Sequence, residues 1–208
     1  IQFIVQIILA RLLLPEDYGL IALVTIFILL ANVLVESGLN TALIQKKSAD
    51  DYDFSTIFYL SLSIAGSLYI VLFLTSPFIA KFYSQPQLEP VLRVLSITLL
   101  FGAINPIQNA FVARKLLFKK LFFSSLGATF ISGTIGIMAA YNGWGVWALV
   151  IQQLVNGFSR TVILWFTVKW RPRLLFSIKR AKGLFSYGWK LLVSSIIDIL
   201  YGDIQSLV

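Results

Sequence analysis

The sequence contains no cysteine and no histidine. Their absence excludes disulfide frameworks, thiol nucleophiles, histidine acid–base catalysis and the usual zinc sites. The phosphate-binding pattern G-x-x-x-x-G-K-[ST] is absent too, so an ATP-driven pump would need a separate subunit. We therefore expect neither an enzyme nor a bound cofactor.

Charge is also scarce. Charged residues make up 12% of the 208 residues and hydrophobic residues 58%, whereas soluble domains carry about 25% charged residues. The longest uncharged run, Leu121–Ser159, would be about 58 Å long as one helix, nearly twice a hydrocarbon core of about 30 Å. Its middle, Tyr141–Gly145, has turn chemistry. The run therefore predicts a membrane-embedded helical hairpin, with spans near 121–140 and 146–168.

The remaining uncharged runs predict further spans, so we expect an all-α, polytopic transmembrane helix bundle. Pro15-Glu16-Asp17 should close the first span and form a short turn with the next two residues. The expected spans are residues 1–14, 18–35, a stretch within 54–80 ending near Pro77, 94–113, and a seventh beginning near Tyr187.

The chain is expected to be a fragment of a two-bundle transporter. Residues 1–168 would form an N-terminal six-helix bundle with a truncated first helix. Residues 169–185 would be a basic cytoplasmic connection, and residues 186–208 the start of a second bundle. Ile1–Val5 resembles Ile204–Val208, which suggests an internal repeat in which spans one and seven open two parallel six-helix halves.

Basic residues predict the orientation. Loops on one side of the expected spans hold thirteen Lys and Arg residues, and loops on the other side hold three. This asymmetry indicates that the basic loops and the N-terminus are cytoplasmic and that Tyr141–Gly145 faces outward. The net charge of +8 thus suggests membrane lipids and no nucleic acid partner. With Trp170 and Phe176 interleaved, Lys169–Lys182 could form an amphipathic helix on anionic lipid.

Arg160 is the principal candidate for binding, because an ionisable residue within a span usually faces a cavity or a partner. Gln153 and Asn156 share its helix face at i, i+3, i+7 spacing. That face suits an anionic headgroup. The alternative is an arginine that extends its side chain to the cytoplasmic interface.

Arg11 is a second candidate. It could form a salt bridge with Glu16 or Asp17 at the interface, or it could be a cavity cation for phosphate.

Asn105, Gln108 and Asn109 stand at i, i+3, i+4 around Pro106. They could line a cavity at a helix kink or form hydrogen bonds between helices, and the pattern favours neither.

Two carboxylates in the expected seventh span, Asp198 and Asp203, are ion-coupling candidates, although either could simply pair with an arginine. Glu36 is expected at the interface. Small residues recurring every four positions predict a close packing face on the fifth span: Ser124, Ala128, Ser132, Gly136 and Ala140.

Four motifs in order resemble the polysaccharide transporter family, the Wzx-type oligosaccharide flippases of the MOP superfamily. They are Ala10–Gly19 (ARLLLPEDYG), Glu36–Lys47 (ESGLNTALIQKK), Gly143–Leu149 (GWGVWAL) and Lys169–Pro172 (KWRP).

The resemblance implies alternating access between two six-helix bundles that move undecaprenyl-diphosphate-linked oligosaccharides across the bacterial inner membrane. Arg11 is the cation within the first motif. A lipid-linked oligosaccharide would be the substrate, and a polysaccharide polymerase or chain-length regulator a further partner. The alternatives are a MATE-like exporter of organic cations, a non-transporting assembly protein, and an intramembrane glycosyltransferase or polymerase.

Overall fold

The computed structural model describes residues 1–36, 43–44 and 49–183, and the regular secondary structure over these ranges is helical, which confirms the all-α prediction. Its principal helices are α1 (Gln2–Leu12), α2 (Pro15–Glu36), α4 (Asp51–Phe82), α5 (Leu88–Leu95), α6 (Thr98–Arg114), α7 (Phe118–Tyr141) and α8 (Val146–Thr167).

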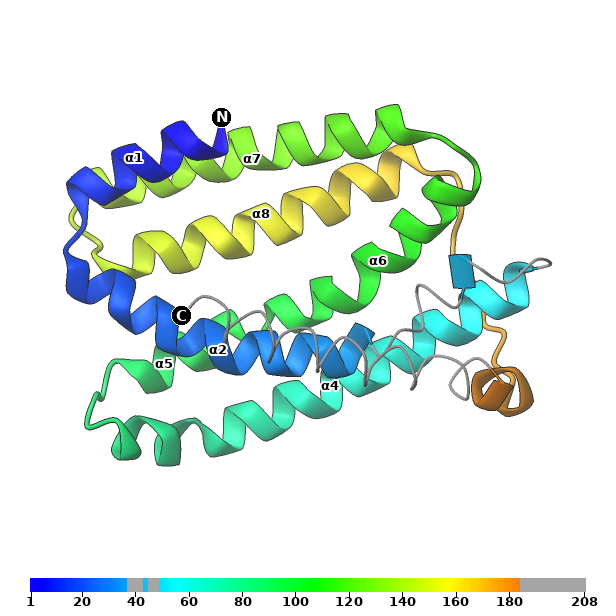
Figure 1. The fold of residues 1–208 in the computed structure, drawn as a ribbon, viewed down its shortest axis with the longest axis horizontal. Coiled ribbons are helices and arrows are strands. Elements are labelled where there is room, and N and C mark those ends of the chain that lie inside the picture. The colour runs from blue at the N-terminus through cyan, green and yellow to red at the C-terminus, as the bar shows by residue number, and fades with distance from the viewer. Residues whose placement is uncertain (37–42, 45–48, 184–208) are drawn as a thin grey trace, which may run out of the picture.

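The helices run back and forth between two ends of the molecule (Figure 1). The α1–α2, α4–α5 and α7–α8 connections lie at one end. The start of α4, the α6–α7 connection and the segment after α8 lie at the opposite end. We call this opposite end the basic end, because Lys115, Lys119 and Lys169 belong to its connections or adjoin them.

Within the described ranges, four segments are long and apolar enough to cross a membrane: Pro15–Val35, Asp51–Phe82, Leu88–Arg114 and Phe118–Tyr141. The α1 helix is apolar but only 11 residues long. The α8 helix has 22 residues and packs along α7, but polar residues on one of its faces make it less apolar.

The predicted turn at Pro15 is wrong, because α2 begins at this residue. A proline fits the first helical position, where its missing N–H group has no helical partner to lose. Asp17 adds to this start, since its carboxylate accepts the backbone N–H of Leu14 at 3.1 Å. The residues expected to separate two helices therefore form the first turn of the second.

The predicted end near Pro77 is also wrong, because α4 continues through this proline to Phe82. Proline leaves the carbonyl four residues earlier, that of Phe73, without its helical donor. Two side chains replace that donor. The hydroxyl of Ser76 donates to this carbonyl at 2.8 Å, and Nε of Arg93 lies 3.4 Å from the same oxygen.

The fourth span starts earlier than the predicted 94–113. It comprises α5 and α6, which together form the candidate span Leu88–Arg114. Glu89 and Arg93 form an ion pair 2.9 Å long within α5. The hydroxyl of Ser96 donates to a carbonyl of α5, and such local bonds favour a break in a helix.

The predicted hairpin is confirmed, with α7 and α8 joined by a turn in which Gly143 and Gly145 adopt φ angles of 74° and 52°. The predicted packing face is buried along α7. A Cβ atom at Gly136 would lie 2.9 Å from Cβ of Gln152, so the two helices touch closely there.

The predicted amphipathic helix over Lys169–Lys182 is wrong for most of its length. Residues 168–177 contain no helix, and helical residues are described only from 178 to 183. Backbone N–H groups of the non-helical part instead donate to hydroxyl groups on α4.

Gly136→Ala is expected to destabilise the α7–α8 hairpin, because the added methyl group overlaps Gln152 and such overpacking costs about 1–3 kcal/mol. The thermal unfolding midpoint of the full-length protein in detergent should fall by several degrees. The control is Gly66→Ala, where a Cβ atom meets nothing within 4 Å and alanine favours the helix. Equal midpoints for the two variants would contradict the close contact.

Candidate functional site

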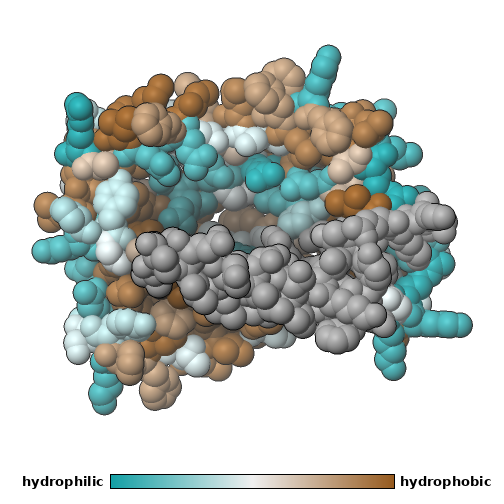
Figure 2. All heavy atoms as spheres, viewed as in Figure 1, coloured by the Kyte–Doolittle hydropathy of each residue, from teal (hydrophilic) through white to brown (hydrophobic). Residues whose placement is uncertain are grey.

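A cavity of about 1020 Å³ lies between α1, α2, α6, α7 and α8. Figure 2 shows this face of the molecule hollowed near its middle, with hydrophilic residues around the hollow and hydrophobic residues along the upper and lower edges. The volume is at the upper limit of the roughly 300–1,000 Å³ that is usual for small-molecule sites. The described helices therefore border an open cavity whose lining combines polar and apolar side chains.

Five of the six predicted substrate-binding residues line this cavity. Gln153, Asn156 and Arg160 come from α8, and Asn105 and Asn109 come from α6. The i, i+3, i+7 spacing on α8 places its three side chains on one face, and that face borders the cavity. Their role as ligands for a substrate stays a prediction.

Arg11, the sixth predicted residue, is not among the lining residues and lies exposed on the last turn of α1. No ion pair joins it to Glu16 or Asp17 within the described residues, where Asp17 instead caps α2. The structure thus places one of the two candidate arginines at the cavity and the other outside it.

Two hydrogen bonds between side chains join the helices around the cavity. The Thr161 hydroxyl donates to Oδ1 of Asn105 at 3.0 Å, and Nδ2 of Asn156 donates to the Ser132 hydroxyl at 3.0 Å. Both alternatives for Asn105 therefore hold, since it lines the cavity and also joins α6 to α8. Gln108, grouped with it in the sequence, is fully buried outside the lining.

Several buried polar atoms at the cavity have no hydrogen-bond partner within the described part of the chain. They are Nε of Arg160, Oδ1 of Asn32, Oδ1 of Asn109 and the hydroxyl of Tyr18. A buried polar group without a partner costs about 1–3 kcal/mol. They can bind water or a polar group of a ligand only when the side chains that cover them move.

The electrostatics of the cavity are simple. Arg160 is the one charged side chain among the described lining residues, and the other polar side chains there are neutral amides and hydroxyls. A guanidinium group can bind two oxygens of a phosphate at once. The cavity can thus hold one anionic group at Arg160 and many neutral hydroxyl groups elsewhere.

Sequence reasoning missed the hydroxyl and amide residues on the most apolar helices. On α2, Tyr18, Thr25 and Asn32 recur every seven residues within an uncharged span, and all three line the cavity. This spacing places them on one face of a helix and could have identified them. The other missed lining residues include Gln2, Gln6, Thr98, Ser125, Thr129 and Gln152.

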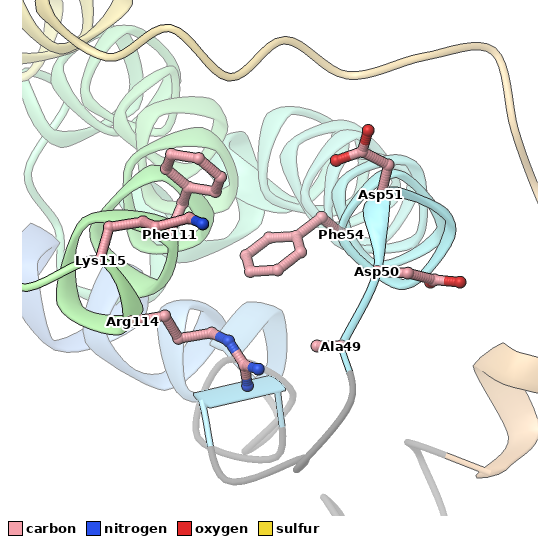
Figure 3. Close-up of a pocket in the computed structure, with 7 residues that line it drawn as sticks. All are labelled: Ala49, Asp50, Asp51, Phe54, Phe111, Arg114 and Lys115. Carbon is pink, nitrogen blue, oxygen red and sulfur yellow. The ribbon is translucent and has the colours of Figure 1, made fainter.

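A second, smaller pocket of about 260 Å³ lies at the basic end (Figure 3). Arg114 and Lys115 approach it from α6, while Asp50, Asp51 and Phe54 lie on the α4 side. The Arg114 guanidinium donates to the backbone carbonyls of residues 43 and 44. This pocket has charges of both signs and shares no lining residue with the large cavity.

The predicted ion-coupling residues Asp198 and Asp203 lie outside the described residues. Within the described ranges, no group of three His, Cys, Asp or Glu side chains could hold a metal ion. The site is therefore defined by Arg160 and the neutral lining.

Comparison with known proteins finds relatives that are named for the biosynthesis or transport of polysaccharides. Residues 8–208 match the model of a family described as "Polysaccharide biosynthesis protein". The succinoglycan biosynthesis transport protein ExoT of Rhizobium meliloti is 24% identical over 96% of this chain and 40% of its own length. The teichuronic acid biosynthesis protein TuaB of Bacillus subtilis is 26% identical over 86% of this chain and 37% of its own length. The lipopolysaccharide biosynthesis protein WzxC of Escherichia coli is 24% identical over 97% of this chain and 41% of its own length.

No solved structure matches the chain. The chain spans about two fifths of the length of the curated relatives it matches.

We expect the cavity to contain water. A cysteine replacing Gln153 should react with a charged, membrane-impermeant thiol reagent, because thiolates form and react only where water has access. The control is Phe130→Cys on α7, whose side chain is apolar and 63% exposed on the outside of the bundle. These 208 residues contain no cysteine, so each introduced thiol can be followed alone within them. Equal labelling of the two positions in proteoliposomes would contradict a water-filled cavity.

Proposed function

Since the chain belongs to the polysaccharide biosynthesis protein family, we propose that it is part of a flippase for undecaprenyl-diphosphate-linked oligosaccharides. The flippase would move repeat units across the bacterial inner membrane by alternating access, for O-antigen, capsule or exopolysaccharide export. Residues 1–168 would supply the N-terminal bundle, residues 169–185 the connection and residues 186–208 the start of the second bundle. The remainder of a protein of the relatives' length would complete it.

The composition of the large cavity carries this proposal. A diphosphate and several sugars cannot cross hydrocarbon unaided, because each unsatisfied polar group there costs several kcal/mol. The cavity provides hydrogen-bonding side chains in place of water along helices that are apolar elsewhere. Arg160 would bind the diphosphate, and Gln153, Asn156, Asn105 and Asn109 would bind sugar hydroxyl groups.

The distribution of charge supports an orientation. The basic end would be cytoplasmic, because cytoplasmic loops of membrane proteins are enriched in lysine and arginine. Arg160 is seven residues from the end of α8 on that side. A substrate arriving from the cytoplasmic leaflet would therefore reach the guanidinium with its charged group first.

The rival functions fit the cavity less well. An exporter of organic cations needs an acidic site, and the described lining contains no carboxylate. A non-transporting assembly protein needs no polar cavity of this size. Asp198 and Asp203 stay candidates for ion coupling in the complete protein.

Replacement of Arg160 tests the proposed diphosphate site. Arg160→Gln in the full-length protein should reduce flipping by roughly 10–100-fold, because a hydrogen bond to a charged group contributes about 1.5–3 kcal/mol. Arg160→Lys should retain part of the activity through its charge. Arg11→Gln should have a smaller effect, since Arg11 does not line the cavity.

The measurement is the leaflet distribution of lipid-linked oligosaccharide in a deletion strain that expresses each variant at equal level. Lys81→Gln is the matched control, because it removes an exposed basic residue at the opposite end from Arg160. Normal flipping by Arg160→Gln would refute the diphosphate role of this arginine. Repeat units that reach the outer leaflet in the deletion strain itself would refute the flippase.

A further inference from the structure

Residues 169–183 lie with one side against the start of α4. Trp170 is buried there, with its ring centroid 5.7 Å from that of Phe54 and 6.2 Å from that of Phe111. Beyond it, the backbone N–H of Arg173 donates to the Ser55 hydroxyl at 3.1 Å. The non-helical part of the segment is thus fixed to α4.

The three arginines of this segment are engaged by the protein itself. Arg173 pairs with Asp51 at 3.6 Å, and Arg180 pairs with Asp50 at 2.5 Å and Asp53 at 3.3 Å. The hydrogen bond from Arg180 lowers the pKa of Asp50 to about 2, so this pair stays charged at neutral pH.

Arg171 donates to the backbone carbonyls of Trp165, Val168 and Trp170, and its guanidinium lies over the Trp165 ring. It therefore caps the end of α8, whose carbonyl groups favour a cation.

The three lysines behave differently. Lys169, Lys179 and Lys182 are exposed, and no hydrogen bond or ion pair joins them to another described residue. Residues 169–183 include no Asp or Glu. The arginines therefore hold the segment in place, and the lysines leave a positive charge on its outer side.

Apolar side chains share that outer side. The chain bends at Leu174, where the N–H of Leu175 donates to the carbonyl of Arg173 at 2.7 Å, and Leu174 and Phe176 are 93% and 53% exposed. In the helical turn that follows, Arg180 pairs with the start of α4 and Ala181 is buried, whereas Ile178 is 64% exposed. We call Leu174, Phe176, Ile178, Lys179 and Lys182 the outer strip.

The outer strip lies at the depth of a membrane surface. The 32 residues of α4 are about 48 Å long, which exceeds a hydrocarbon core of about 30 Å. Charged residues lie at both ends of α4, Asp51 in the first turn and Lys81 in the last, so each end lies in a headgroup region. The segment contacts residues 50–56, at one of these ends.

We propose that the outer strip binds the anionic phospholipid surface of the leaflet at the basic end. Its apolar side chains insert at the boundary between headgroups and acyl chains, and its lysines contact anionic headgroups. This binding anchors the segment that leaves α8, independently of any substrate in the cavity.

Spin labels on the full-length protein test this proposal, with any cysteine outside these 208 residues replaced. Single cysteines at Leu174, Phe176 and Ile178 are labelled in phosphatidylcholine vesicles with and without phosphatidylglycerol. The anionic lipid should raise the ratio of oxygen to nickel-chelate collisions by about twofold or more, because the labels move into the acyl region. A label at the half-buried Leu175 is the control and should not respond.

Two further conditions test whether the lysine charges cause the response to phosphatidylglycerol. Lys179→Gln with Lys182→Gln should abolish the response to phosphatidylglycerol. Raising the salt to about 1 M should weaken it, since the screening length falls to about 3 Å. Labels that collide freely with the nickel chelate in both kinds of vesicle, or that neither reagent reaches because protein covers them, would each overturn the proposal. None of these readouts requires transport, so failure of the flippase assignment would leave them unchanged.

Discussion

The lack of water in hydrocarbon is the constraint that arranges this bundle. Polar side chains on membrane-embedded helices are tolerated where they face one another or a hydrated space. The polar residues of α2, α6, α7 and α8 accordingly meet at one cavity, although they come from distant parts of the sequence. Cross-helix hydrogen bonds such as those of Asn105 and Asn156 also hold the walls of that cavity together.

Close helix packing complements this arrangement. The small residues of α7 let α8 approach, so that the polar face of α8 is held against the cavity. Ser132 belongs to both systems, because it lies on the packing face and also accepts a hydrogen bond from Asn156. A feature interpreted as purely structural in the sequence thus contributes to the site.

The basic end shows how arginine and lysine divide their roles. Arginines pair with carboxylates and cap a helix end, where their planar groups form several directed bonds. Lysines in the same segment stay exposed, and their flexible chains suit a diffuse negative surface. The arginines thus hold the segment after α8 against α4, and the lysines remain free to carry the outward-facing positive charge.

Composition and periodicity were sufficient for much of this protein. They predicted the all-α membrane fold, the α7–α8 hairpin, the packing face on α7 and the polar face of α8, because each of these depends on residues within one helix. They failed at Pro77, where α4 continues with help from the distant side chain of Arg93. They also failed at Pro15, where a local bond from Leu14 to Asp17 marks a helix start that was interpreted as a turn.

Tertiary structure alone decided which polar residues meet. It placed Arg160 at the cavity and Arg11 outside it, separated Gln108 from Asn109, and bound the basic segment to α4. The physical reason is that a helix determines only which side chains share a face. The neighbour that each face meets depends on how all the helices pack together.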